Sequence, residues 1–288
     1  MRELIISILE HLSLATVTSV GALGVLLLPV ILPCLLLGFL AGRIRQAVMP
    51  YGVPGMALFG WLGIPLHEFF HTLPLILTGQ GPQIGRVELG DVRPQGFMGM
   101  VAGSTSNWNP LKTIGAFLCD YTPLFGGVTV MVILTRLLIP KFTFDLGAAP
   151  GLPLFDHSVA FAPSRYLPFI GDLARYVVST IRDLIGHMDF TDPRTWLYLY
   201  LVFSISQHMT PSYQDVRVSW WSASLLLLIL ILLNAAVLFF SFDPSAGVLA
   251  LLAGPMAVLA SLLYFGLVLT LIAMPFALLL WVLAGGPH

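Results

Sequence analysis

Long apolar runs separated by short polar connections dominate the order of residues in this chain. Most of these runs are longer than a strand or helix in a soluble core needs, and exceed the about 20 helical residues that cross the hydrocarbon core of a bilayer. They occupy six segments: 14–41, 51–78, 111–139, 195–208, 212–240 and 246–284. We therefore predict an all-α polytopic membrane protein with six transmembrane segments.

Two of the six segments do not have the length of one upright spanning helix. Residues 195–208 would cover roughly 20 Å at about 1.5 Å per residue, so this helix would end inside the membrane, just before Pro211. Residues 246–284 are too long for an upright span. A steeply tilted helix with a kink at Pro275, or two helices with a turn near Gly266, would explain them equally well. The second alternative would raise the number of spans to seven.

Two stretches between the apolar segments have patterns of their own. Residues 83–102 carry Gly, Val and Leu in loose alternation, which predicts a small strand-like insertion. In residues 168–188 the apolar side chains recur at steps of three and four, and the charged side chains fall mostly on the other side. This periodicity predicts an amphipathic helix at the membrane interface. It also fits a helix that packs on the protein's own loops.

Composition and charge support lipid as the main solvent. Hydrophobic residues make up 57% of the 288 positions and charged residues 9%, whereas about 25% of the residues in a typical soluble domain are charged. So few charged groups cannot cover a globular surface of this size. The net charge of −1, without a cluster of Lys or Arg, argues against a nucleic-acid partner. No polar linker divides the chain, so we expect residues 1–288 to form one integral membrane domain.

The strongest chemical signal is the sequence His67-Glu68-Phe69-Phe70-His71 within the second apolar segment. Residues four apart share one face of a helix, so both imidazoles can bind one metal ion, and Glu68 can reach a water molecule there. A carboxylate in the middle of a bilayer helix costs on the order of 3 kcal/mol, which a bound ion would offset. A hydrogen-bonded polar network is the alternative, although membrane helices usually use Ser, Thr or Asn for this purpose. We predict a Zn2+ site with His67 and His71 as ligands and Glu68 as the catalytic base.

A third protein ligand is expected, because catalytic zinc sites commonly have three protein ligands and a water. The stretch 206–215, at the end of the short fourth segment, offers two candidates. Asp215 is the first, although it could instead cap the helix that follows Pro211. His208 is the second, and both residues could bind. Gln207 and His208 could alternatively donate hydrogen bonds to a developing oxyanion.

These motifs together resemble the site-2 protease family of intramembrane zinc metallopeptidases. The resemblance rests on HEFFH in one membrane helix, a strand-like insertion after it, and an Asp near a proline-broken helix two spans later. It covers residues 51–240, about two thirds of the chain, as the expected catalytic core. The resemblance implies that His67, His71 and Asp215 hold zinc and that Glu68 is the base.

The second motif departs from the family pattern. The family has Asn-Pro upstream and Leu-Asp-Gly at the distal ligand. This chain has Gln207-His208 and then Gln214-Asp215-Val216. The match is therefore closer at the histidine pair than at the third ligand and the oxyanion group.

The predicted function is hydrolysis of a peptide bond in or near a transmembrane segment of a membrane-protein substrate, with Glu68 as general base. Residues 83–102 could bind the unwound substrate by strand addition. One alternative is a non-catalytic zinc-binding membrane scaffold or transporter. A transporter should carry ionisable residues along a path across several spans, but most intramembrane charge here lies at the two motifs, with Asp120 the main exception. Another alternative is a zinc hydrolase that acts on a lipid or a small amide.

Overall fold

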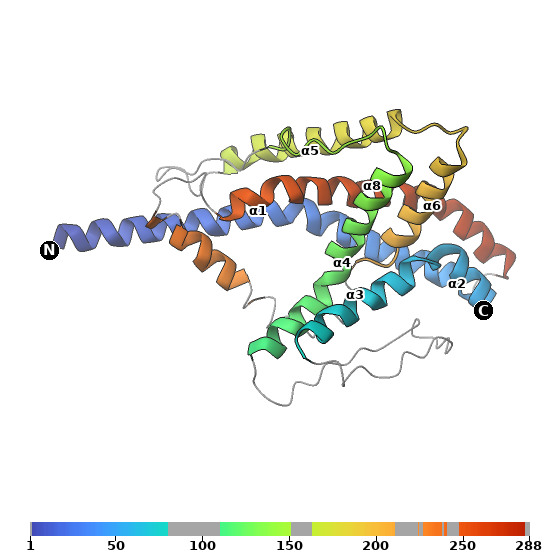
Figure 1. The fold of residues 1–288 in the computed structure, drawn as a ribbon, viewed down its shortest axis with the longest axis horizontal. Helices are drawn as coiled ribbons and strands as arrows, with labels where there is room; N and C mark the ends of the chain where they lie inside the picture. Colours follow the sequence, from blue (N-terminus) through green and yellow to red (C-terminus); the bar gives the residue numbers. More distant parts are fainter. Residues whose placement is uncertain are drawn as a thin grey trace. The chain divides into compact units, whose positions relative to one another are not determined.

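The structure of this chain is a computed structural model that describes residues 2–79, 110–150, 163–210, 224, 227–237, 239–240 and 248–285. Every regular element within these ranges is a helix (Figure 1), which confirms the all-α prediction. The elements in chain order are α1 (Arg2–Val48), the 3₁₀ helix η1 (Met49–Tyr51), α2 (Gly52–Gly60), α3 (Gly63–Leu77), α4 (Pro110–Leu138), α5 (Pro163–Gly186), α6 (Pro193–Ser206) and α8 (Val248–Leu283). The predicted strand-like insertion at 83–102 lies outside the described residues, as does most of 212–240, of which Leu227–Val237 is described as an apolar helix.

Three helical stretches are long and apolar enough to cross a membrane, namely Ile5–Gly55, Tyr121–Leu138 and Leu251–Leu283. In the most apolar window of each stretch, between 22% and 39% of the residues are buried inside the protein. Most of the apolar side chains therefore face outward, which water disfavours and lipid permits. The described residues thus contain three candidate spans, compared with the six or seven predicted.

The second predicted segment, 51–78, is two short helices instead of one continuous span. Helix α2 ends at Gly60 and α3 begins at Gly63, where the chain meets α6. The backbone N–H groups of Leu62 and Gly63 donate to Ser204 Oγ at 3.2 and 3.1 Å, so a side chain of α6 satisfies amides that a helix start leaves open. A Cβ on Gly63 would lie 2.0 Å from the Ser204 carbonyl oxygen, so only glycine permits this contact.

The short and the long segments near the C-terminus follow the predictions more closely. Helix α6 has 14 residues and begins at an N-cap, Asp192, whose carboxylate accepts from the backbone N–H of Arg194 at 2.8 Å. Before it, the hydroxyl of Thr191 donates to Asp189, which lowers the pKa of that carboxyl below its ordinary value. Helix α8 runs without interruption through Gly266, so the alternative of a turn there is wrong.

Gly266 instead marks a close contact between helices. A Cβ at this position would lie 2.6 Å from Cβ of Ser206, so the missing side chain lets α6 and α8 approach each other. Nearby, Tyr198 of α6 is fully buried and stacks on Phe265 of α8 with 6.3 Å between ring centroids. Its hydroxyl shares a hydrogen bond of 2.9 Å with Thr135 of α4. These contacts hold α6 against α4 and α8.

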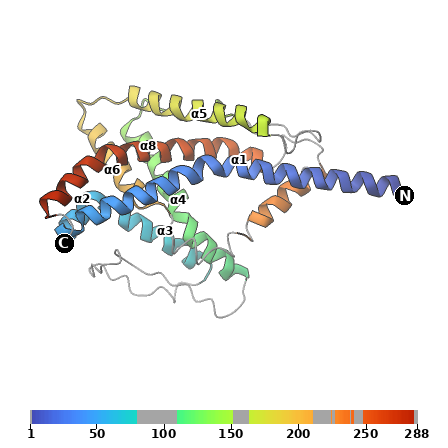
Figure 2. The same ribbon diagram turned by 180° about the vertical axis from the view of Figure 1, so that it is seen from behind.

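The chain forms two compact units, each assembled from three stretches of sequence. Unit 1 consists of Met1–Leu32, Thr143–Gly186 and Ala223–Ser261, and unit 2 of Pro33–Phe142, His187–Ser222 and Leu262–His288. Helices α1 and α8 contribute residues to both units. In unit 1, α1 runs beside α8 (Figure 2), and Ala22, Leu23 and Leu26 of α1 pack with Ala253 of α8.

Helix α5 confirms the helical part of the amphipathic prediction for residues 168–188. Its buried apolar side chains lie on one face, whereas Asp172, Arg175, Arg182 and Asp183 are exposed. The buried face includes Phe169, Leu173, Tyr176, Val177 and Leu184. The hydroxyl of Tyr176 donates to the carbonyl of Asp145 at 3.0 Å. The apolar face thus packs within unit 1, and a location at a membrane interface stays a prediction.

Unit 2 contains both chemical motifs. Helix α3 packs along α4, and α6 packs on α2, α3 and α4 (Figure 1). Buried residues of the end of α1, α2 and the end of α8 form an apolar core, namely Ile44, Ala47, Val48, Phe59 and Ala277. Gln207 and His208 follow directly after α6, and the ring of His208 lies against Gly63 at the start of α3.

Candidate functional site

The two histidines of HEFFH lie one turn apart on α3, as their spacing predicts. Their Nε2 atoms are 2.8 Å apart, and the rings are perpendicular, with 4.3 Å between centroids. Two nitrogen ligands at 2.0–2.1 Å from a tetrahedral zinc ion are about 3.3 Å apart. The two ring nitrogens therefore converge to within about 0.5 Å of the separation that one shared ion requires.

Helix α4 holds His71 in one tautomer. The imidazole is buried, and its Nδ1 lies 2.7 Å from the carbonyl oxygen of Cys119. Because a carbonyl can only accept, Nδ1 carries the proton and Nε2 keeps its lone pair. Metal-binding histidines commonly have this arrangement, in which a backbone carbonyl fixes the ring and frees the other nitrogen for the ion.

His67 is the less constrained member of the pair. Its Nδ1 is buried and, within the described part of the chain, has no hydrogen-bond partner. The 2.8 Å contact also fits a hydrogen bond from His67 Nε2 to His71 Nε2, which would make Nδ1 of His67 an acceptor. An N–H at Nδ1 is the tautomer that leaves Nε2 for a metal ion.

Glu68 follows His67 on α3 and is half-buried. Its Oε2 atom is shielded from solvent, and its backbone carbonyl accepts a hydrogen bond of 2.8 Å from Thr72 Oγ1. A carboxylate in this position, one residue beyond a metal-binding histidine, can act as a proton acceptor in a sheltered site.

His208 lies directly beyond α6, against the junction of α2 and α3. Its Nδ1 donates to the carbonyl of Ser204 at 3.2 Å. The ring fills the space left by two glycines, since a Cβ on Gly60 would lie 2.6 Å from Cε1 of His208 and a Cβ on Gly63 would lie 2.8 Å from Nδ1. The glycines therefore seat this imidazole beside the helix that carries the histidine pair.

The third ligand stays a prediction. Among the residues that the structure describes, no group of three or more His, Cys, Asp or Glu side chains is placed to hold one metal ion. Asp215 lies outside the described residues. The structure thus brings His67 and His71 together, with Glu68 beside them, and leaves the choice between Asp215 and His208 to experiment.

Gln207 is oriented by α8. Its Nε2 donates to Thr270 Oγ1, and that hydroxyl donates in turn to the carbonyl of Gly266 at 2.8 Å. The hydroxyl proton is therefore engaged, so Thr270 must be the acceptor for the Gln207 amide. This contact uses one of the two amide N–H groups of Gln207, and donation to an oxyanion stays a prediction.

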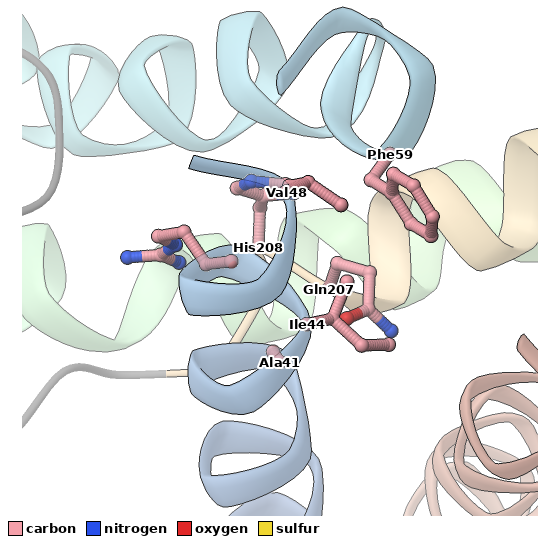
Figure 3. Close-up of a pocket in the computed structure, with 7 residues that line it drawn as sticks. Ala41, Ile44, Val48, Phe59, Gln207 and His208 are labelled. Atoms are coloured by element: carbon pink, nitrogen blue, oxygen red, sulfur yellow. The ribbon is translucent and has the colours of Figure 1, made fainter. Parts of the chain in front are cut away.

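Sequence reasoning missed Arg45 as a neighbour of the site. Arg45 belongs to α1 and lines a pocket together with Gln207 and His208. Apolar residues of α1 and α2 form the other wall of this pocket (Figure 3). Arg45 and His208 are both near enough to His67 to act on it electrostatically. The predicted apolar segment 14–41 ends before Arg45, whereas α1 continues to Val48, so no local signal pointed to this residue.

Comparisons with known proteins leave the family open, since no protein-family model matches the chain and no curated protein or solved structure is detectably similar.

Close packing around HEFFH predicts a large effect of a small substitution. A Cβ on Gly126 of α4 would lie 2.4 Å from Cδ1 of Phe70, so Gly126→Ala must displace this aromatic ring or α3 itself. We expect Gly126→Ala to destabilise the protein by about 1–3 kcal/mol, as overpacking typically does. Thermal unfolding in detergent measures this. Gly42→Ala is the matched control, because a Cβ there meets open space, and equal stability of the two variants would contradict the prediction.

Proposed function

We propose that this protein is a multi-pass intramembrane zinc metallopeptidase that hydrolyses a peptide bond in or near a transmembrane segment of a membrane-protein substrate. The observation that carries the proposal is the convergence of Nε2 of His67 and Nε2 of His71 at 2.8 Å, with the His71 ring held by the Cys119 carbonyl. Glu68 stands next to this pair on the same helix.

The donor set suits zinc. Imidazole nitrogens with a carboxylate as third ligand are among the common combinations in catalytic zinc sites. His67 and His71 would hold the ion, and Asp215 or His208 would complete the set. A bound zinc ion supplies Lewis-acid polarisation of the scissile carbonyl and acidifies a water molecule.

Glu68 is the proposed carrier of the proton. It takes one proton from the attacking water as the water oxygen bonds to the carbonyl carbon, and it delivers that proton to the nitrogen as the C–N bond breaks. One water is consumed, and the peptide bond becomes a carboxyl group and an amine. The half-buried position of Glu68 keeps this transfer away from bulk solvent.

The surroundings of α3 support a site at membrane depth. The helix exposes apolar side chains on the side away from the buried His71, with Phe69 54% and Ile76 56% exposed. Together with the three candidate spans, this outward apolar surface is what a helix in lipid presents. A substrate in the same layer would have to be locally unwound, because a helix hides its backbone.

The third ligand can be assigned by metal content. We expect Asp215→Ala to lower zinc occupancy more than His208→Ala does, because a carboxylate also neutralises part of the ion's charge and because the family resemblance assigns an Asp. Zinc per chain in the two purified variants and in the wild type measures this. The reverse ranking would assign the third position to His208.

The decisive test of the function is the substitution Glu68→Gln. Zinc content and cleavage of a co-expressed membrane-anchored reporter should be measured on the same preparations. Loss of cleavage with zinc retained supports the peptidase. Undiminished cleavage with zinc retained contradicts it.

A further inference from the structure

A pocket with room for one water molecule lies next to His208, whose ring packs against Gly63 at the start of α3. It leaves about 10 Å³ for the centre of a water-sized sphere, which matches the space that a single water needs. Its polar wall consists of Arg45 of α1 and of two residues that follow α6. These two, Gln207 and His208, are labelled in Figure 3. All these residues belong to unit 2.

The side-chain carbonyl oxygen of Gln207 is a buried hydrogen-bond acceptor to which no described residue donates. Gln207 is 3% exposed, and its Oε1 has no hydrogen-bond partner among the residues that the structure describes. The amide cannot simply be turned over, because Thr270 Oγ1 uses its own proton on Gly266 and requires the N–H side of Gln207. A buried carbonyl oxygen in this situation calls for a donor from outside the protein's own groups.

The other two polar residues complement this acceptor. Nδ1 of His208 donates to the Ser204 carbonyl, so the neutral ring keeps Nε2 as a second acceptor. Arg45 has donors and no acceptor. The polar wall therefore offers two acceptors, Gln207 Oε1 and His208 Nε2, together with the N–H donors of Arg45. A cation is disfavoured by the guanidinium, and an anion by the two lone pairs.

Water has the matching set of groups. It donates two hydrogen bonds and accepts at least one, and buried waters typically make about three. We propose that the Arg45–Gln207–His208 pocket binds one water molecule, which donates to Gln207 and His208 and accepts from Arg45. We further propose that water molecules on their way to Glu68 bind here first, which we call the station role of the pocket. The station role rests on the proposed peptidase function, whereas the binding site itself does not.

The position of the pocket supports the station role. Arg45 and His208 are near enough to His67 to interact with it electrostatically. The His208 ring also packs on Gly63, the first residue of α3, the helix that carries Glu68. Because hydrolysis consumes water and the surrounding walls are apolar, polar groups beside the site are needed to hold a water there.

The binding site is tested by a structure of the full-length, zinc-loaded protein at a resolution that shows ordered water. We expect one peak at about 2.7–3.2 Å from Gln207 Oε1 in the wild type, and its loss in Gln207→Leu, which keeps the bulk of the side chain and removes the acceptor. A wild-type structure in which Oε1 instead accepts directly from Arg45, or in which the peak is absent, would overturn the proposal.

The station role is tested by filling the pocket. Ala41 is buried and lines it, so Ala41→Leu should displace the water and lower kcat with KM and zinc content unchanged. Gln207→Leu, which leaves the pocket's shape in place, should do the same if Ala41→Leu fails to fold. Full cleavage in a variant whose structure lacks the water would end the station role.

A Glu68→Gln variant that still cleaves would instead end the peptidase proposal and leave the water site standing.

Discussion

Glu68→Gln is expected to reduce cleavage by about 10² to 10⁴-fold, the usual contribution of general acid and base catalysis. Glutamine has nearly the same volume as glutamate and still forms hydrogen bonds, but it cannot take a proton from water. The variant should therefore keep its zinc, its fold and its membrane insertion. Cleavage of a membrane-anchored reporter, measured beside zinc content and thermal stability in detergent, checks each of these.

A matched control separates the role of Glu68 from a general effect of losing a carboxylate. Glu10→Gln removes a carboxylate from an exposed position of α1 and should leave cleavage unchanged. If Glu68 only balances charge in a structural metal site, Glu68→Gln should loosen the ion or lower stability, and any hydrolysis should persist. That combination would favour the zinc-binding scaffold over the enzyme.

His67→Ala and His71→Ala are each expected to abolish zinc binding, which should be about one ion per chain in the wild type. The two imidazoles converge on one point and are the only proposed ligands from a single helix, so removal of either leaves one nitrogen. His71→Ala also removes the contact to the Cys119 carbonyl. It should therefore cost more stability than His67→Ala. Elemental analysis of purified protein, combined with thermal unfolding, measures both effects.

The control for this pair is His11→Ala, which removes a half-buried imidazole of α1 that lies outside both motifs. It should keep zinc at the wild-type level. Full zinc occupancy in His67→Ala would place the ion elsewhere and end the site as proposed. Loss of zinc in His11→Ala would show that the assay responds to damage rather than to ligand removal.

Local pattern was sufficient for the helices and for the histidine pair. Apolar runs of the required length predict helices in lipid, and α4, α6 and α8 follow the predicted segments within a few residues. The spacing of His67 and His71 predicts a shared face, because 3.6 residues complete one turn. These predictions depend only on residues that are near each other in sequence.

Contacts between residues far apart in sequence decided the features that local pattern did not predict. The break between α2 and α3 depends on Ser204, more than 140 positions along the chain, whose hydroxyl satisfies the amides at the start of α3. No local feature around Leu62 announces that partner, so the sequence suggested one continuous span. The tautomer of His71 likewise depends on a carbonyl of α4, and backbone carbonyls are present at every position of every sequence.

The orientation of Gln207 shows most directly how local sequence and tertiary contacts determine different features. Its residue type offered both a donor and an acceptor, and sequence reasoning could weigh it only as a possible donor to an oxyanion. Thr270, 63 positions later, accepts from one of the two N–H groups and thereby fixes which way the amide is turned beside Arg45. The sequence by itself determined which helices form and which side chains share a helix face, because those follow from local geometry. Only tertiary packing decided which hydrogen-bonding group of each side chain remains available, because that depends on partners brought together by the fold.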